Sequence, residues 1–203
     1  MKLTHIIPLL TLATAVYAAP QTFDFKDPKG VNNAVFKLDA PLESINGSAN
    51  GISGTVSFDA ENPSATTGKI VIATESLVVP NPMMNGHLHS DKWLDAAKFP
   101  EITFEVKSLA NVKTEGNATT ADVTGTFALH GVTNEITAPV KLTYLKDKLG
   151  DRVPNLKGDL LVIRANFKIN REDFNINKGQ YTDKVSTSIE LSLSIAGAAV
   201  AKE

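Results

Sequence analysis

Apolar and polar residues alternate with a period of two along most of the chain beyond about residue 20. The segment from Ser188 to Ile195 shows this most clearly, because isoleucine or leucine occupies every second position and serine or glutamate fills the positions between. A period of two puts alternate side chains on opposite faces of a β-strand. The same pattern predicts strands over 52–59, 102–107, 123–129 and 161–170, and weaker ones over 23–25, 34–39, 69–74 and 136–144.

Short clusters of glycine, asparagine and proline separate these segments and predict turns. They lie at Asn46-Gly47, Asn50-Gly51, 61–63, 115–117 and 157–158. Nothing in the chain resembles a βαβ unit, so we predict an all-β, antiparallel fold. Periodicity alone allows a sandwich or a closed barrel. The long, regular last strand would be an exposed edge in an open sheet, which favours the barrel.

One segment, residues 80–100, breaks the alternation and predicts an insert with a short helix near residues 90–98. Ser90 can cap a helix over 91–97 through its hydroxyl, and Pro100 would end it. Trp93 and Leu94 give the insert an apolar side. Such a side would either cover one end of a barrel or pack as ordinary core.

The first 18 residues have the three-part pattern of a secretory signal peptide. Lys2 gives a positive start, an apolar stretch follows over 6–15, and 16–18 supply the residues that a signal peptidase reads. The apolar stretch is too short to span a membrane. We therefore expect cleavage after Ala18 and an exported mature chain with one domain over 19–203.

Composition narrows the function classes. The chain has 203 residues, of which 42% are hydrophobic, enough for one substantial core. Its 20 basic and 22 acidic residues give a net charge of -2, which argues against a nucleic-acid partner. The absence of cysteine excludes disulfides, thiol catalysis and thiolate metal sites.

The sequence contains only weak indications of a catalytic or metal-binding site. His87 and His89 form an HxH pair, but they lie in the insert, and His130 is distant in sequence. No G-x-S-x-G motif and no phosphate-binding glycine loop occur. We predict no catalytic residue, no metal site and no cofactor. Arg171, at the end of a strong strand, would either pair with a nearby carboxylate to fix a turn or face the headgroup of a ligand.

Three segments resemble motifs of one protein family. They are N-G-H-L-H-S through W-L-D-A-A-K-F-P-E-I-T-F over 85–104, V-T-G-T-F-A-L-H-G-V-T over 123–133, and I-N-R-E-D-F-N-I over 169–176. In order and spacing these resemble the YceI-like family of periplasmic proteins that bind lipids or polyisoprenoids. The chain departs from the family pattern at four positions: His89, Phe127, Ala128 and Asn175.

The resemblance implies an eight-stranded, lipocalin-like barrel whose interior holds an isoprenoid, such as a quinone tail or a polyprenyl phosphate. It implies a non-catalytic carrier in the periplasm, which would contact a membrane or a membrane redox protein transiently. Oligomeric state stays open, a dimer included. The candidate ligand-binding residues are Phe36, Phe58, His87, Leu88, Trp93, Phe104, Phe127, Phe167, Arg171 and Phe174.

Two other functions stay open from the residues alone. The first is a metal-dependent enzyme, which would require His87, His89 and His130 to converge. The second is a structural or adhesion module with the filled core of a β-sandwich.

Overall fold

The structure, a computed structural model, describes residues 19–201. The expected signal peptide over 1–18 lies outside the described residues. Eleven strands form one antiparallel sheet. In chain order they are β1 (Gln21–Asp24), β2 (Asn33–Asp39), β3 (Ser44–Ala49), β4 (Ile52–Phe58), β5 (Thr67–Ala73), β6 (Leu77–Val78), β7 (Glu101–Glu115), β8 (Ala118–Leu129), β9 (Val132–Leu145), β10 (Gly158–Asn170) and β11 (Ser188–Val200).

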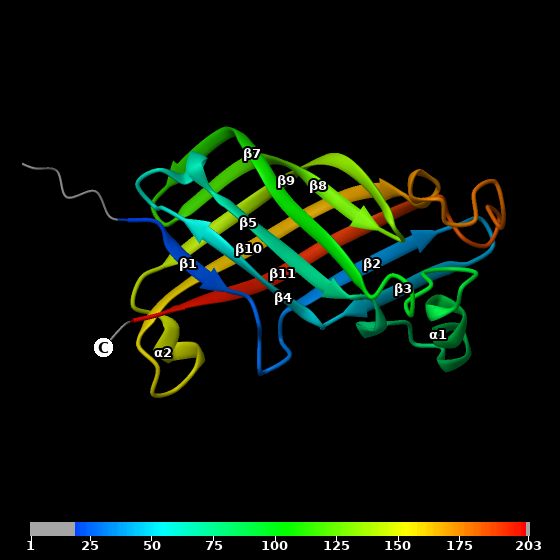
Figure 1. The fold of residues 1–203 in the computed structure, drawn as a ribbon, viewed down its shortest axis with the longest axis horizontal. Coiled ribbons are helices and arrows are strands. Elements are labelled where there is room, and N and C mark those ends of the chain that lie inside the picture. The colour runs from blue at the N-terminus through cyan, green and yellow to red at the C-terminus, as the bar shows by residue number, and fades with distance from the viewer. Residues whose placement is uncertain (1–18, 202–203) are drawn as a thin grey trace, which may run out of the picture.

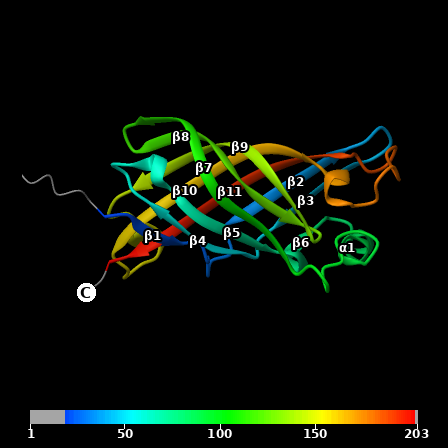
Figure 2. The same cartoon turned by 45° about the horizontal axis from the view of Figure 1, so that its top comes forward.

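The sheet closes on itself, so the fold is a barrel and not a sandwich. Its ring runs β1–β4–β5–β7–β8–β9–β10–β11 and closes through the pairing of Asp24 in β1 with Ala198 in β11. This is the eight-stranded barrel that the family resemblance implied, and its strands are antiparallel, as the alternation and the turns predicted. Figures 1 and 2 show the long strands β7 to β11 wrapping around the interior.

Three of the eight strand lines are each divided into two short strands. β1 and β2 pair with the same edge of β11. β3 pairs with β2, and β6 pairs with β3. Thus β1 and β2, β3 and β4, and β5 and β6 are interrupted versions of single barrel strands. The interruption between β5 and β6 is the short 3₁₀ turn η2 (Thr74–Ser76).

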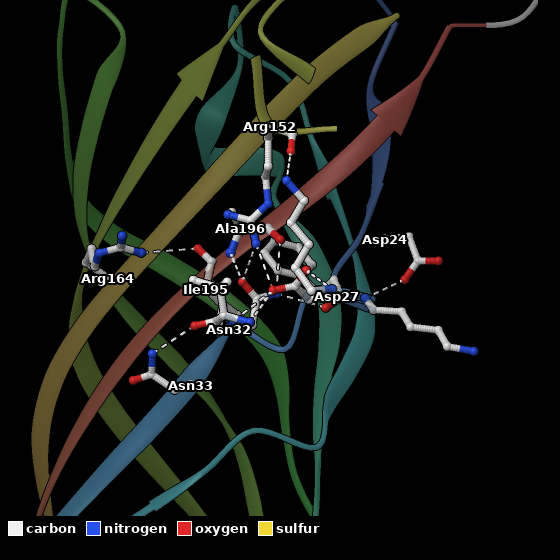
Figure 3. A network of polar contacts seen from close by, with 12 residues as sticks. Asp24, Asp27, Asn32, Asn33, Arg152, Arg164, Ile195 and Ala196 are labelled. Carbon is white, nitrogen blue, oxygen red and sulfur yellow. Dashed lines mark hydrogen bonds and ion pairs between the residues drawn. The ribbon is translucent and has the colours of Figure 1, made fainter. Parts of the chain in front are cut away.

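A polar network bridges the interruption between β1 and β2 (Figure 3). The side-chain amide of Asn32 accepts from the Ala196 N–H at 2.9 Å and donates to the Ala196 carbonyl at 3.1 Å and the Phe25 carbonyl at 3.0 Å. The amide thus supplies the hydrogen bonds that a paired strand residue would give to β11. Asp27 fixes the loop by accepting from the Asn32 N–H and from Arg152, both at 2.8 Å.

The helix of the insert lies earlier than predicted. The prediction over 91–97 is wrong: α1 spans Pro82–His89, and Ser90 is its C-cap, not an N-cap. Asn81 caps the helix by accepting from the Met83 N–H, and Pro82 fits the first helical turn because it needs no N–H partner there. Other short helical pieces are α2 (Leu149–Arg152), η1 (Pro63–Ala65) and η3 (Arg171–Phe174). None of the helices within 19–201 is long and apolar enough to cross a membrane.

The turn predicted at Asn46-Gly47 is also wrong, because both residues lie inside β3. Asn46 pairs with Lys37 and Gly47 with Phe36. A Cβ at Gly47 would overlap the Phe36 ring and approach the Val78 carbonyl oxygen at 2.6 Å. Glycine therefore serves close packing here and not a turn.

The interior has two packed regions. The terminal end, where β1 begins and β11 ends, holds one buried cluster that includes Phe23, Phe25, Phe58 and Leu161. The insert end, where α1 and the 171–187 connection lie, holds another that includes Phe36, Phe127 and Phe174. Figure 1 shows α1 and the connection from β10 to β11 at the opposite end of the barrel from the C-terminus.

Candidate binding cavity

A cavity of about 210 Å³ runs from the insert end through the middle of the barrel and reaches residues of the terminal-end cluster, among them Val56, Ile70 and Leu142. Its walls come from the inner faces of the strands that the alternation predicted. The inward positions of β7 and β10, for example, supply Ile102, Phe104, Val106, Ile163, Phe167 and Ile169. The lining is almost entirely apolar, as expected where alternate residues of every barrel strand face inward.

Two phenylalanine rings of the lining lie against glycines of neighbouring strands. Phe104 in β7 covers Gly125 in β8, and Phe36 in β2 covers Gly47 in β3. A Cβ at either glycine would overlap the ring. Because glycine leaves room at the wall, the outer edge of each ring occupies the space that a Cβ would take.

Phe127 forms the aromatic centre of the insert end. Its ring meets Phe174 edge-on with centroids 5.5 Å apart and Phe167 with centroids 6.4 Å apart. Phe174 is buried behind this contact and does not line the cavity, whereas Phe127 and Phe167 do. Edge-to-face pairs at these separations contribute to packing beyond the area they bury.

The insert covers this end of the cavity. Leu88 from α1 and Trp93 and Leu94 from the following turns belong to the lining. Trp93 also stacks on Tyr181 of the 171–187 connection, with ring centroids 5.8 Å apart. The Asn177 side-chain amide donates to the Lys92 carbonyl oxygen at 2.6 Å. The apolar side of the insert therefore caps the barrel, which was one of the two expectations for it.

Arg171 is the one ionisable group of the lining, and it is only 1% exposed. Its guanidinium has five N–H donors. Nε donates to Ser186 O at 3.1 Å, and the two terminal nitrogens donate at 2.6–3.3 Å to the carbonyl oxygens of Ile176, Asn177, Gln180 and Val185.

All five Arg171 contacts are therefore carbonyls of the connection that it organises, and none is a carboxylate. The structural role predicted for Arg171 is present, but its partners are not the expected ones. Burial lowers the pKa of Arg171 below its ordinary value, although nearby Glu172 opposes the shift. No N–H of this guanidinium is left to bind a ligand headgroup.

The histidines each have a different environment. His89 Nε2 lies 2.8 Å from the Leu77 carbonyl oxygen, and His130 Nδ1 lies 3.2 Å from the Phe174 carbonyl oxygen. His87 is exposed on α1 and does not line the cavity. Within residues 19–201, no three His, Asp or Glu side chains gather as a metal site would require.

The structure brings seven of the ten candidate residues to the cavity. Phe58 lies instead in the packed terminal end, buried next to Tyr144. Several lining residues were not among the predicted ligand-binding residues, for example Ile176, Ile189, Leu191 and Leu193. The last three were on the apolar face of the clearest predicted strand, so the alternation contained the signal for them. Nothing comparable marked Ile176, which lies in the connection after η3.

Residues 27–197 match the YceI-like domain. The chain belongs to the YceI-like family. The resemblance drawn from the three motifs is thus confirmed. Over 146 residues the chain is 36% identical to Protein YceI of Salmonella arizonae, covering 71% of this chain and 69% of the relative.

Solved structures share the fold of this YceI-like domain. The YceI protein of Campylobacter jejuni is 26% identical, with a TM-score of 0.61 over 77% of this chain and 85% of that one. A polyisoprenoid binding domain from Saccharophagus degradans is 15% identical, with a TM-score of 0.63 over 89% of this chain and 99% of that one. At the latter identity the likeness shows the fold alone.

Proposed function

We propose that the protein is an exported, non-catalytic carrier that binds the apolar chain of an isoprenoid or similar lipid inside its barrel. The observation that carries the proposal is the cavity of about 210 Å³ whose lining is almost wholly apolar. The polyisoprenoid binding domain from Saccharophagus degradans has the same fold, which supports the proposed ligand class.

The size and chemistry of the cavity suit a slender chain. Because a cavity of about 150 Å³ holds benzene, 210 Å³ accommodates on the order of eight carbons. Each buried methylene contributes about 0.8 kcal/mol. An isoprenoid chain end therefore gains several kcal/mol by leaving water, without any hydrogen bond from the protein.

The place of action is part of the same proposal. The signal-peptide pattern over 1–18 supports export, and the YceI-like family supports the periplasm. A carrier for an isoprenoid must collect its ligand from a membrane or from a protein bound there. Transient contact with a membrane or a membrane redox protein follows from the proposed ligand.

Mass spectrometry of an organic extract of the purified mature protein tests the ligand class. An isoprenoid in stoichiometric amount is the expected result. The protein is also refolded from denaturant in the presence of a short-tail quinone. Trp93 is the only tryptophan and lines the cavity, so its fluorescence should shift or be quenched on binding.

The matched variant is Phe104→Trp, which adds bulk to the cavity wall. It should retain less lipid per protein while the melting temperature stays close to that of the wild type. Wild-type protein that takes up no isoprenoid by either route would overturn the proposed function.

A further inference from the structure

The barrel wall opens between β9 and β10 toward the insert end. The two strands pair from Leu145 with Leu160 to Val140 with Ala165, and the ladder stops there. Beyond that point, residues 132–139 of β9 pair only with β8, and residues 166–170 of β10 pair only with β11. Figures 1 and 2 both show β9 bending away from β10 in this region.

A groove follows the opening. Asn134, Glu135 and Ile136 form its β9 side, and its other walls are Lys168, Ile169, Asn170, Asp173, Phe174 and Ser188. Ile169 belongs to the groove and to the lining of the apolar cavity. The inward residues Ile136 and Phe167 are only half-buried here, whereas Ala138 and Ala165 beside the paired stretch are buried. The groove therefore lies where the apolar interior meets solvent.

The groove is polar, in contrast to the cavity. The Asn134 side-chain amide donates to the Asp173 carbonyl oxygen, and Asn170 Oδ1 accepts from the Glu172 N–H, both at 2.9 Å. The remaining amide groups of these two side chains and the Ser188 hydroxyl offer neutral hydrogen-bonding groups. The cation of Lys168 pairs with Glu190 at 2.8 Å, and Glu135 pairs with Lys107 at 2.7 Å. Asp173 is exposed and has no ion-pair partner within residues 19–201.

The charge of the groove is thus one uncompensated carboxylate, with no unpaired cation among its walls. The neighbouring Arg171 adds no donor, because its five N–H groups bind the carbonyls of the connection. A phosphate would meet like charge here, whereas an alcohol or a quinone would meet amide and hydroxyl partners.

We infer that the groove between β9 and β10 holds the polar head of the bound lipid and favours a neutral head over a phosphate. This inference rests on the proposed function, since the tail must occupy the cavity for the head to reach the groove. It selects polyprenols and prenylated quinones from the wider isoprenoid class.

Geraniol and geranyl phosphate test the inference, because they share one ten-carbon tail, close to the capacity of the cavity, and differ in the head. Equilibrium dialysis of the mature protein should show tighter binding of geraniol. Asp173→Lys should strengthen geranyl phosphate binding about fivefold at low salt and leave geraniol binding unchanged. The gain should fade near 1 M salt, where the Debye length falls to about 3 Å. Asp173→Asn should give a smaller gain in the same direction.

Glu61→Lys is the matched control, since it makes the same charge change at an exposed residue of the β4–β5 turn, near the terminal end. An equal gain from Glu61→Lys, or tighter geranyl phosphate binding by the wild type, would overturn the inference and leave the carrier proposal standing. Binding of neither compound to the folded wild type would overturn both. Melting curves establish that each variant is folded.

Discussion

The two ends of the barrel interior are both rich in phenylalanine, yet only the phenylalanines of the insert end line the cavity. At the terminal end Phe23 and Phe58 meet Tyr144, with ring centroids 6.2 and 6.1 Å apart, and fill the space between strands. At the insert end the rings of Phe36 and Phe104 lie over Gly47 and Gly125. The number of aromatic residues therefore does not decide whether a barrel is filled. The residue beneath each ring and the side chains that pack on its other face decide it together.

The terminal end offers an internal comparison for the glycine contacts. Phe25 lies on Gly197 of β11, and a Cβ there would come within 2.7 Å of the ring. Phe25 is nevertheless 0% exposed and outside the cavity lining. A ring that lies over a glycine leaves space in the interior only where nothing packs on its other face. At this end the Phe23, Phe58 and Leu161 side chains occupy the core.

The largest expected effect is on stability at the terminal end. Phe58→Ala should cost about 3–5 kcal/mol of unfolding free energy, because a buried ring leaves an unfilled hole. Phe104→Ala should cost roughly half as much, since this half-buried ring already borders the cavity. Urea unfolding measures both. Phe104→Ala should also change the lipid retained per protein, and Phe58→Ala should not. Equal losses of stability would mean that the two ends are packed alike.

A somewhat smaller loss is expected from Arg171→Met. The substitution leaves up to five carbonyls of the 171–187 connection without their charged donor, which should cost about 2–4 kcal/mol. Hydrogen exchange should rise first in this connection and only later at the terminal end. Arg164→Met, which changes an exposed arginine of β10, is the control and should have little effect. Unchanged exchange in Arg171→Met would show that the connection is held by its apolar contacts alone.

The third prediction compares the glycine that lies under a phenylalanine ring at each end. Neither Gly125 nor Gly197 has a left-handed backbone, so alanine is sterically allowed by the main chain at both. Gly125→Ala should push the Phe104 ring into the cavity and weaken lipid binding about tenfold, with a stability loss of about 1–3 kcal/mol. Gly197→Ala should lose similar stability, because Phe25 has no void to enter, and bind lipid normally.

The double variant Gly125→Ala, Phe104→Leu keeps this prediction falsifiable. The smaller leucine leaves room for the new methyl group, so lipid binding should return toward the wild-type level. Failure of the rescue, with the fold intact by melting, would show that the alanine acts on the strand pairing at the Glu105 carbonyl and not through the ring.

The sequence predicted the walls of the barrel better than its ends. The period of two holds in β8, β10 and β11, and in β7 as far as the bulge after Val106, because each strand has one face in the core, and the inward residues of these stretches were identified correctly. The sequence signals that place helices and turns in the loops are weaker than this period. Ser90 and Asp91 are as suitable for starting a helix as Asn81 and Pro82, and only the contacts of Asn85 with Val79, at 2.7 and 3.1 Å, favour the earlier start.

The cavity and the groove depend on pairings that lie far apart in sequence. That the Phe104 ring covers Gly125, which pairs with Val106 two residues further along β7, follows from the register of β7 against β8, which a β-bulge shifts just beyond, between Val106 and Ser108. That β9 leaves β10 after Val140 depends likewise on which residues pair across the barrel. Periodicity assigns a residue to a face, but it contains no information about register between strands.

The smallest expected effect concerns alkaline pH and the terminal end. Burial and the hydrogen bond that the Tyr144 hydroxyl donates to Asp159 at 2.6 Å raise the pKa of Tyr144 from 10.0 to about 12. The folded state holds this proton more tightly than the unfolded state. The raised pKa therefore adds to the free energy of unfolding, fully below about pH 10, and this stabilisation is lost as the pH rises toward 12. The wild type should therefore lose melting temperature over this range more steeply than Tyr144→Phe, which has no phenol to titrate. Lysine deprotonation lowers both curves alike, so the difference between them isolates Tyr144. Trp93 fluorescence with a bound quinone should stay constant until the barrel unfolds, since Tyr144 does not line the cavity. Parallel melting curves for the two proteins would show that the phenol is already solvated in the native terminal end.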